Sequence, residues 1–157
     1  MPTVEQILSG LREITNTWRA VAIIWHAYFA ALTFVLVFGI RPSKRVFGIS
    51  LGLPLLSVSI IAWASSNPFN GILFALISII VIYISTKLPR ENVQVAPLWV
   101  LIPGILMFIF GWVYPHFLDT SSFWSYLYFA PTGLIPCPTL SIVIGLMLMV
   151  NGLGSVS

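Results

Sequence analysis

Residues 71–83 read Gly-Ile-Leu-Phe-Ala-Leu-Ile-Ser-Ile-Ile-Val-Ile-Tyr, an apolar run without a charged side chain. A strand of a membrane barrel alternates apolar and polar residues, and this run does not alternate. Since only helices and closed barrels satisfy their backbone groups in lipid, the run predicts a membrane helix.

The composition of the whole chain agrees with this interpretation. Its 157 residues are 59% hydrophobic and 7% charged, with a mean hydropathy of +1.02. A soluble domain carries roughly 25% charged residues, so water is not the main solvent of this chain. The net charge of +3 comes from residues in short loops, which does not fit nucleic-acid binding. One cysteine excludes an internal disulfide framework.

Charged loops and turn-forming residues divide the chain into about five spanning helices, where about 20 residues are needed to cross the hydrocarbon core. The uncharged stretch 46–86 is too long for one crossing, and the cluster Ser65 to Gly71 is typical of a turn within it. We expect a single all-α transmembrane domain over residues 1–157, a polytopic helix bundle. Its spanning helices lie near residues 20–40, 46–64, 68–88, 97–114 and 138–152.

Residues 1–18 predict an N-terminal amphipathic helix, with Thr3 as N-cap and Gln6 as its capping-box partner. Two roles fit such a helix: lying in the headgroup region, or docking a partner protein. Its apolar side chains recur at the spacing of one helical face, at Val4, Ile7, Leu8, Leu11, Ile14 and Trp18.

Residues 115–133 differ from the spanning segments because they combine Asp119 and serines with many aromatic side chains. Aromatic residues gather where the membrane meets water. We therefore expect an extracytoplasmic loop here, with a short interfacial or re-entrant helix around residues 121–129.

The distribution of basic residues predicts the orientation of the bundle. Two loops on one side hold five of the seven basic residues, and the other side holds Arg12 and Arg19 beside three acidic residues. Cytoplasmic loops carry an excess of Lys and Arg, so we expect the N-terminus outside and the C-terminus in the cytoplasm. The five are Arg41, Lys44, Arg45, Lys87 and Arg90.

The string 131–139 reads Pro-Thr-Gly-Leu-Ile-Pro-Cys-Pro-Thr and is the most distinctive local feature. Pro136 and Pro138 suit a helix start, where a backbone N–H has no partner in any case. A break at this point can also expose carbonyls and the Cys137 thiol to a cavity, as in discontinuous transporter helices. His116 and Asp119 would then be weak candidates to join Cys137 as metal ligands. The alternative is that Cys137 is a small buried hydrophobe, and a structural zinc site needs four ligands.

His26 lies within the first predicted span. An ionisable group in lipid is a functional hypothesis by default. The alternative is a neutral imidazole bonded to Ser57, Ser59, Ser78 or a backbone carbonyl of a neighbouring helix, because burial favours the neutral form. The sequence contains no catalytic, phosphate-binding or dinucleotide motif, so we expect neither enzymatic activity nor a cofactor.

The string 131–139, followed by the apolar run 140–149, resembles the signature of a family of bacterial multi-pass membrane proteins of unknown function. Further pieces are similar in order: Thr3 to Gln6, Arg41 to Ser43, Asn67-Pro68 and Tyr114-Pro115. The resemblance implies a helical inner-membrane protein and no particular activity. The string Gly133 to Pro138 is also similar to one in nickel and cobalt efflux permeases, whose histidine- and aspartate-rich helix this chain lacks.

Together these features predict a non-catalytic accessory or structural subunit that contacts lipid and packs against other membrane proteins or its own copies. The alternative is a small permease for a metal or another solute, with the Pro136 to Pro138 segment and His26 near its path.

Overall fold

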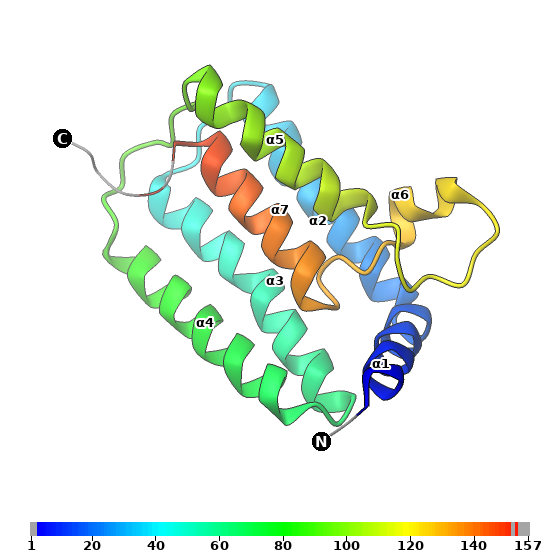
Figure 1. The fold of residues 1–157 in the computed structure, drawn as a ribbon. Helices are drawn as coiled ribbons and strands as arrows, with labels where there is room; N and C mark the ends of the chain where they lie inside the picture. Colours follow the sequence, from blue (N-terminus) through cyan, green and yellow to red (C-terminus); the bar gives the residue numbers. More distant parts are fainter. Residues whose placement is uncertain (1–2, 152, 154–157) are drawn as a thin grey trace.

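The computed structural model describes residues 3–151 and residue 153, and this part of the chain is all-α, as the sequence predicts (Figure 1). Two short elements, the 3-10 turn η1 and the helix α6, interrupt the series of longer helices. The elements are α1 (Val4–Thr17), α2 (Arg19–Val37), α3 (Lys44–Ala64), α4 (Pro68–Lys87), α5 (Leu98–Val113), η1 (Phe123–Ser125), α6 (Tyr126–Phe129) and α7 (Pro136–Met149).

Three helices, α2, α3 and α4, are long and apolar enough to cross a membrane. Two more apolar helices, α5 with 16 residues and α7 with 14, occupy the other predicted spans but are shorter. At 1.5 Å per residue α7 is about 21 Å long, against about 30 Å of hydrocarbon core. It also starts two residues before the predicted position, because both Pro136 and Pro138 lie in its first turn.

The helices α4, α3, α7 and α5 lie side by side, with α2 behind α7 and α5 (Figure 1). Hydrogen bonds tie α2 to α3 and α5, since Tyr28 donates to the carbonyl of Ser50 in α3 and His26 bonds to that of Trp112 in α5. The core therefore runs through the centre of the bundle, around Phe29, Phe47, Leu51, Leu55, Ile142 and Leu146.

The predicted capping box begins α1: Thr3 Oγ1 accepts from the Gln6 amide, and Gln6 Oε1 accepts from the Thr3 amide. The first apolar residues of α1 are exposed, but Leu11, Ile14 and Trp18 pack against a second buried cluster. That cluster comprises Ala22, Ile61, Leu134 and Ile135, so the second half of α1 lies on the bundle.

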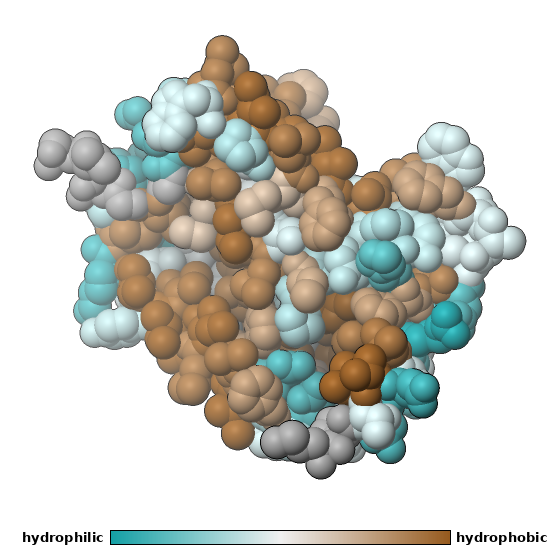
Figure 2. All heavy atoms as spheres, in the orientation of Figure 1, coloured by the Kyte–Doolittle hydropathy of each residue, from teal (hydrophilic) through white to brown (hydrophobic). Residues whose placement is uncertain are grey.

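The two predicted basic loops meet at one end of the bundle. Ser43 and Asn92 form an isolated antiparallel bridge, and Lys44 Nζ lies 3.0 Å from Glu91 Oε2. The helix α1 and the loop after α5 lie at the opposite end (Figure 1). Figure 2 shows hydrophilic side chains concentrated at these two ends, with apolar ones covering the helices between them.

The aromatic loop, predicted over residues 115–133, divides at Ala130. Within the predicted interfacial helix only η1 and α6 are helical, and the indole of Trp112 fastens them by donating to the Leu127 carbonyl. From Ala130 to Ile135 every residue is buried. The loop thus ends in a non-helical segment inside the bundle.

Candidate functional site

The buried segment Ala130–Ile135 leads into α7, and its polar backbone groups need partners because they lie away from water. The hydroxyl of Ser57 donates to the Gly133 carbonyl at 2.8 Å, and the Gly133 amide donates to Thr139 Oγ1 at 2.8 Å. The Thr139 hydroxyl donates in turn to the Ile135 carbonyl at 2.8 Å. One hydroxyl from α3 and one from the first turns of α7 itself therefore replace the helical ladder at this break.

Gly133 is the residue that makes this turn possible. Its φ of +76° lies in the left-handed region, which favours glycine. A Cβ at this position would also lie 2.8 Å or less from the Trp25 ring, whose Nε1 donates to Ser57 Oγ. The indole, the hydroxyl and the Gly133 carbonyl thus form one hydrogen-bonded chain that fixes the start of α7.

The Pro-Cys-Pro sequence reduces the number of unpaired backbone N–H groups at the start of α7. No side chain caps α7, and the first four N–H groups of a helix have no partner within it. The Ile135 amide donates to the Pro131 carbonyl at 3.2 Å, and Pro136 and Pro138 carry no N–H. The Cys137 amide has no hydrogen-bond partner among the described residues at this helix start.

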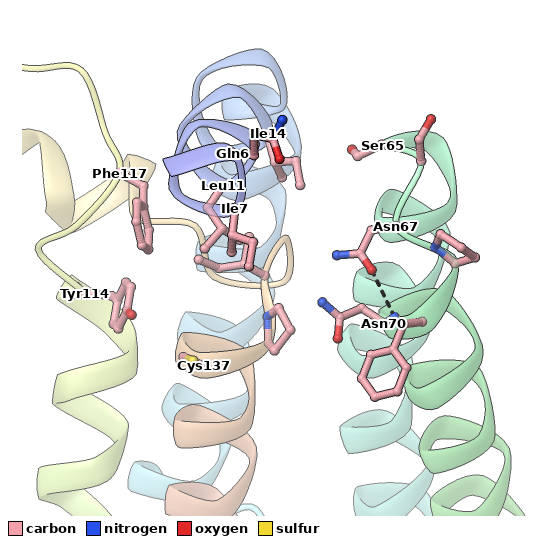
Figure 3. A pocket seen from close by; sticks show the side chains of 16 residues that line it. Gln6, Ile7, Leu11, Ile14, Ser65, Asn67, Asn70, Tyr114, Phe117 and Cys137 are labelled. Carbon is pink, nitrogen blue, oxygen red and sulfur yellow. Dashed lines mark hydrogen bonds between the residues drawn. The ribbon is translucent and has the colours of Figure 1, made fainter. Parts of the chain in front are cut away.

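A groove of about 730 Å³ opens in front of this helix start (Figure 3). One wall consists of α1 and the beginning of α7, and the other is the turn between α3 and α4. Figure 3 shows Asn67 and Asn70 on the second wall, with their amide groups directed across the groove. The lining also includes Gln6, Ile7, Leu11, Tyr114, Phe117 and Cys137.

Cys137 is exposed, which differs from the alternative of a buried small hydrophobe. It lies against Tyr114, the residue that follows α5. Burial, and then the neighbouring Cys137, raise the pKa of the Tyr114 hydroxyl above its ordinary value.

His116 and Asp119, the other two weak metal candidates, lie beside α1 instead. Asp119 pairs with Arg12 at 3.3 Å, and both His116 and Asp119 line a second groove against α1. Among the residues that the structure describes, no three His, Cys, Asp or Glu side chains come together in a way that could hold a metal ion. The geometry therefore gives no support to a site that combines Cys137 with these two residues.

His26 is buried in α2, and both of its ring nitrogens face backbone carbonyls. Nδ1 lies 2.8 Å from the Ala22 carbonyl and Nε2 lies 3.0 Å from the Trp112 carbonyl on α5. Of the partners considered from the sequence, the carbonyl of a neighbouring helix is the one observed. Ser57, Ser59 and Ser78 bond elsewhere.

Asn16 is a structural residue that the sequence analysis did not single out. Its amide donates to the Phe117 carbonyl at 3.0 Å, and its Oδ1 accepts from the Asp119 amide at 3.0 Å and from Arg19. These bonds fasten α1 to the loop after α5 and hold one wall of the groove. In the sequence, Asn16 was visible only as a polar residue on a helix, and such residues are common on any face that contacts water.

Comparison with known proteins adds nothing to this geometry, because no protein-family model, curated protein or solved structure matches the chain.

Proposed function

We propose that this chain is a non-catalytic accessory or structural subunit of a membrane protein complex. The observation that carries the proposal is a largely bonded polar interior, in which Arg19 Nε and Thr33 Oγ1 are the buried side-chain atoms without a hydrogen-bond partner among the described residues. The described residues include seven buried polar side chains, and each of them is within hydrogen-bond distance of a backbone carbonyl of the bundle. Groups that line a permeation path must be free to bind the solute, and these groups are already engaged. They are Thr15, His26, Ser59, Ser78, Ser85, Thr132 and Thr139.

The outward face of α4 supports packing against another membrane helix. This helix buries Gly71, Phe74, Ser78 and Ser85 against α3 and exposes a large apolar surface on the opposite side. Exposed residues there alternate at spacings of three and four, the pattern by which helices interlock in bundles. The exposed stripe is Phe69, Ile72, Leu76, Ile79 and Tyr83, each more than half exposed.

The distribution of charge supports an orientation with the N-terminus outside and the C-terminus in the cytoplasm of a bacterial cell. The basic loops that meet at the bridge between Ser43 and Asn92 would face the cytoplasm. The amphipathic α1 and the aromatic loop would then share the outer interface.

The experiment that tests the subunit proposal is capture of the tagged native protein in mild detergent, followed by mass spectrometry. Stoichiometric recovery of other membrane proteins is expected. Leu76→Ala with Ile79→Ala should reduce that recovery, whereas Leu106→Ala with Ile109→Ala, an exposed pair at the same spacing on α5, serves as the matched control. Recovery of the chain alone would sink the heteromeric proposal.

A small permease is the second candidate, favoured by the buried non-helical segment before α7 and the groove in front of it. Discontinuous helices and unwound backbone at their ends form the binding sites of many transporters. If capture yields the protein alone, solute and metal uptake should be compared between the native chain, Cys137→Ser and His26→Ala. Unchanged uptake in both variants would exclude a path along these residues.

A further inference from the structure

The groove in front of α7 has a lining without formal charge. Its sixteen lining residues include no Asp, Glu, Lys, Arg or His. A charged ligand group would lose its hydration there without gaining a counter-charge. The lining therefore favours an uncharged ligand, and about 730 Å³ is within the range of small-molecule sites.

Two side-chain amides in this lining are held so that they present donors. Asn67 caps α4, and its Oδ1 accepts from the Asn70 amide at 3.2 Å. Gln6 completes the capping box of α1, and its Oε1 accepts from the Thr3 amide at 2.9 Å. Each carbonyl oxygen accepts one hydrogen bond at its own helix start, whereas the NH₂ group is the part of each side chain without a partner among the described residues.

A third donor comes from the start of α7. No described residue accepts a hydrogen bond from the Cys137 amide, and the same holds for Asn67 Nδ2 and Gln6 Nε2. Three helix starts, those of α1, α4 and α7, thus contribute one N–H group each to one groove. The complementary ligand carries hydrogen-bond acceptors.

The remaining lining combines apolar and polar side chains. Ile7, Leu11 and Ile14 of α1 and Phe69 of α4 are apolar, and Asn70, Ser65, Ser66 and Tyr114 are polar. The lining includes α1, the amphipathic helix at one end of the bundle (Figure 1). A molecule that fits this lining has an apolar body and a polar end with hydrogen-bond acceptors.

We infer that the groove binds an uncharged amphiphile whose polar end carries carbonyl oxygens. Two sources of this chemistry exist in a membrane: the ester carbonyls of a glycerolipid and the carbonyls of a quinone. Gln6, Asn67 and the Cys137 amide donate to these oxygens, and the apolar wall of α1 covers the chain. This inference does not rest on the subunit proposal, since a subunit and a permease alike can hold such a ligand.

The test uses Cys137 as a reporter, because it lines the groove and is the single cysteine of the chain. The full chain is placed in nanodiscs of an ether-linked phosphocholine, which has no ester carbonyl. The alkylation rate of Cys137 is measured against increasing dioleoylglycerol, decylubiquinone, or the dialkyl ether analogue of the diacylglycerol. We expect saturable protection by one of the first two probes, which identifies the source, and none by the ether analogue.

Two substitutions separate ligand binding from folding. Asn67→Asp keeps a good N-cap acceptor and Gln6→Glu keeps a capping box, but each replaces the NH₂ donor with an oxygen. Each substitution should raise the probe concentration that gives half of the maximal protection roughly tenfold. This is the effect expected when one hydrogen bond is lost and a repulsive oxygen takes the place of the donor. Asn92→Asp makes the same chemical change at an exposed residue on the other end of the bundle and should have no effect.

Three results would overturn the inference. Protection by neither carbonyl probe excludes the ligand class. Equal protection by the ether analogue excludes recognition of the carbonyl. If the concentration of half-protection is the same in Asn67→Asp and Gln6→Glu as in Asn92→Asp, the proposed donors do not bind the ligand. Circular dichroism verifies that each variant has kept its helices.

Discussion

The helix pairs α3–α4 and α5–α7 both approach closely through glycines, but the glycines of the two pairs meet different atoms. In the first pair, Cβ atoms at Gly48 and Gly52 would meet the side chains of Ser85 and Ile82. In the second pair, a Cβ at Gly104 would lie 2.9 Å from the Gly145 carbonyl oxygen. A side chain can change rotamer, whereas a helix backbone cannot, so α3–α4 is adjustable and α5–α7 is fixed.

This difference bears on the candidate site because α5 sets the position at which α7 begins. A Cβ at Gly111 in α5 would lie 2.5 Å from the carbonyl oxygen of Pro138, in the first turn of α7. The Thr132 hydroxyl of the buried segment also donates to the Gly111 carbonyl at 2.9 Å. The fixed pair therefore holds the helix start that closes one wall of the groove.

The largest expected effect is that of Gly145→Ala. The new methyl would lie 2.7 Å from both the Gly104 carbonyl oxygen and the Phe108 amide nitrogen, so the two helices must separate. We expect a loss of about 3 kcal/mol in the free energy of unfolding, typical of severe overpacking. Thermal unfolding of the detergent-solubilised protein, followed by circular dichroism, measures it.

Gly52→Ala is the matched control, since both substitutions gain the same helix propensity of about 1 kcal/mol. The Ile82 side chain can move away there, so the loss should be smaller than for Gly145→Ala by about 2 kcal/mol. Equal losses for the two variants would show that the pairs do not differ in rigidity.

Gly133→Ala should have the next largest effect, about 2 kcal/mol. The substitution combines an unfavourable φ of +76° with displacement of the Trp25 ring from Ser57. Gly39→Ala separates the two causes, because Gly39 has a φ of +79° and open space around its Cβ direction. The control should lose only about 1 kcal/mol from the strained φ. A Gly39→Ala loss as large as that of Gly133→Ala would remove any role for the Trp25 contact.

The helices of this bundle were predictable because each depends on residues that are close together in the sequence. Hydropathy located α2 to α5 within one to three residues at most ends, and the Thr3 capping box and the Asn67-Pro68 start were visible as short motifs. The fold class follows from the same apolar runs. The position of α7 was less accurate, since the helix predicted over residues 138–152 runs from Pro136 to Met149.

The candidate site was only partly predictable because it depends on contacts between distant residues. The prolines around Cys137 indicated a helix start, and they form one. The groove depends on the approach of α1 and the α3–α4 turn to that start, and no local pattern encodes these distances. Asn67 is an N-cap by sequence, and its role in the groove emerges only from the fold.

A smaller effect is expected from Ser78→Ala in the adjustable pair. The Ser78 hydroxyl donates to the Gly52 carbonyl at 2.9 Å, and Ser59 donates to the Gly71 carbonyl at 2.7 Å. Hydrogen bonds between membrane helices contribute about 0.6 kcal/mol on average, so each alanine variant should lose about that amount. The double variant, measured by the same unfolding assay, should lose the sum because the two bonds share no residue. A loss above about 2 kcal/mol from either single variant would mean that α3–α4 is as rigid as α5–α7.

Gly10→Ala is expected to have the smallest effect, and it should stabilise the protein, whereas the other substitutions destabilise it. Gly10 lies in α1, and a Cβ there would have nothing within 4 Å. Alanine should therefore stabilise α1 by about 0.5–1 kcal/mol through helix propensity alone. Hydrogen exchange of the α1 amides measures this gain, because exchange reports the stability of each helix separately. A gain in the purified chain but a loss of partner recovery in the native membrane would mean that a partner contacts α1 at Gly10. Among the described residues, the glycines closest to the backbone of a neighbouring helix belong to α5 and α7. Such a result would show that Gly10 makes a comparable close contact with a partner protein.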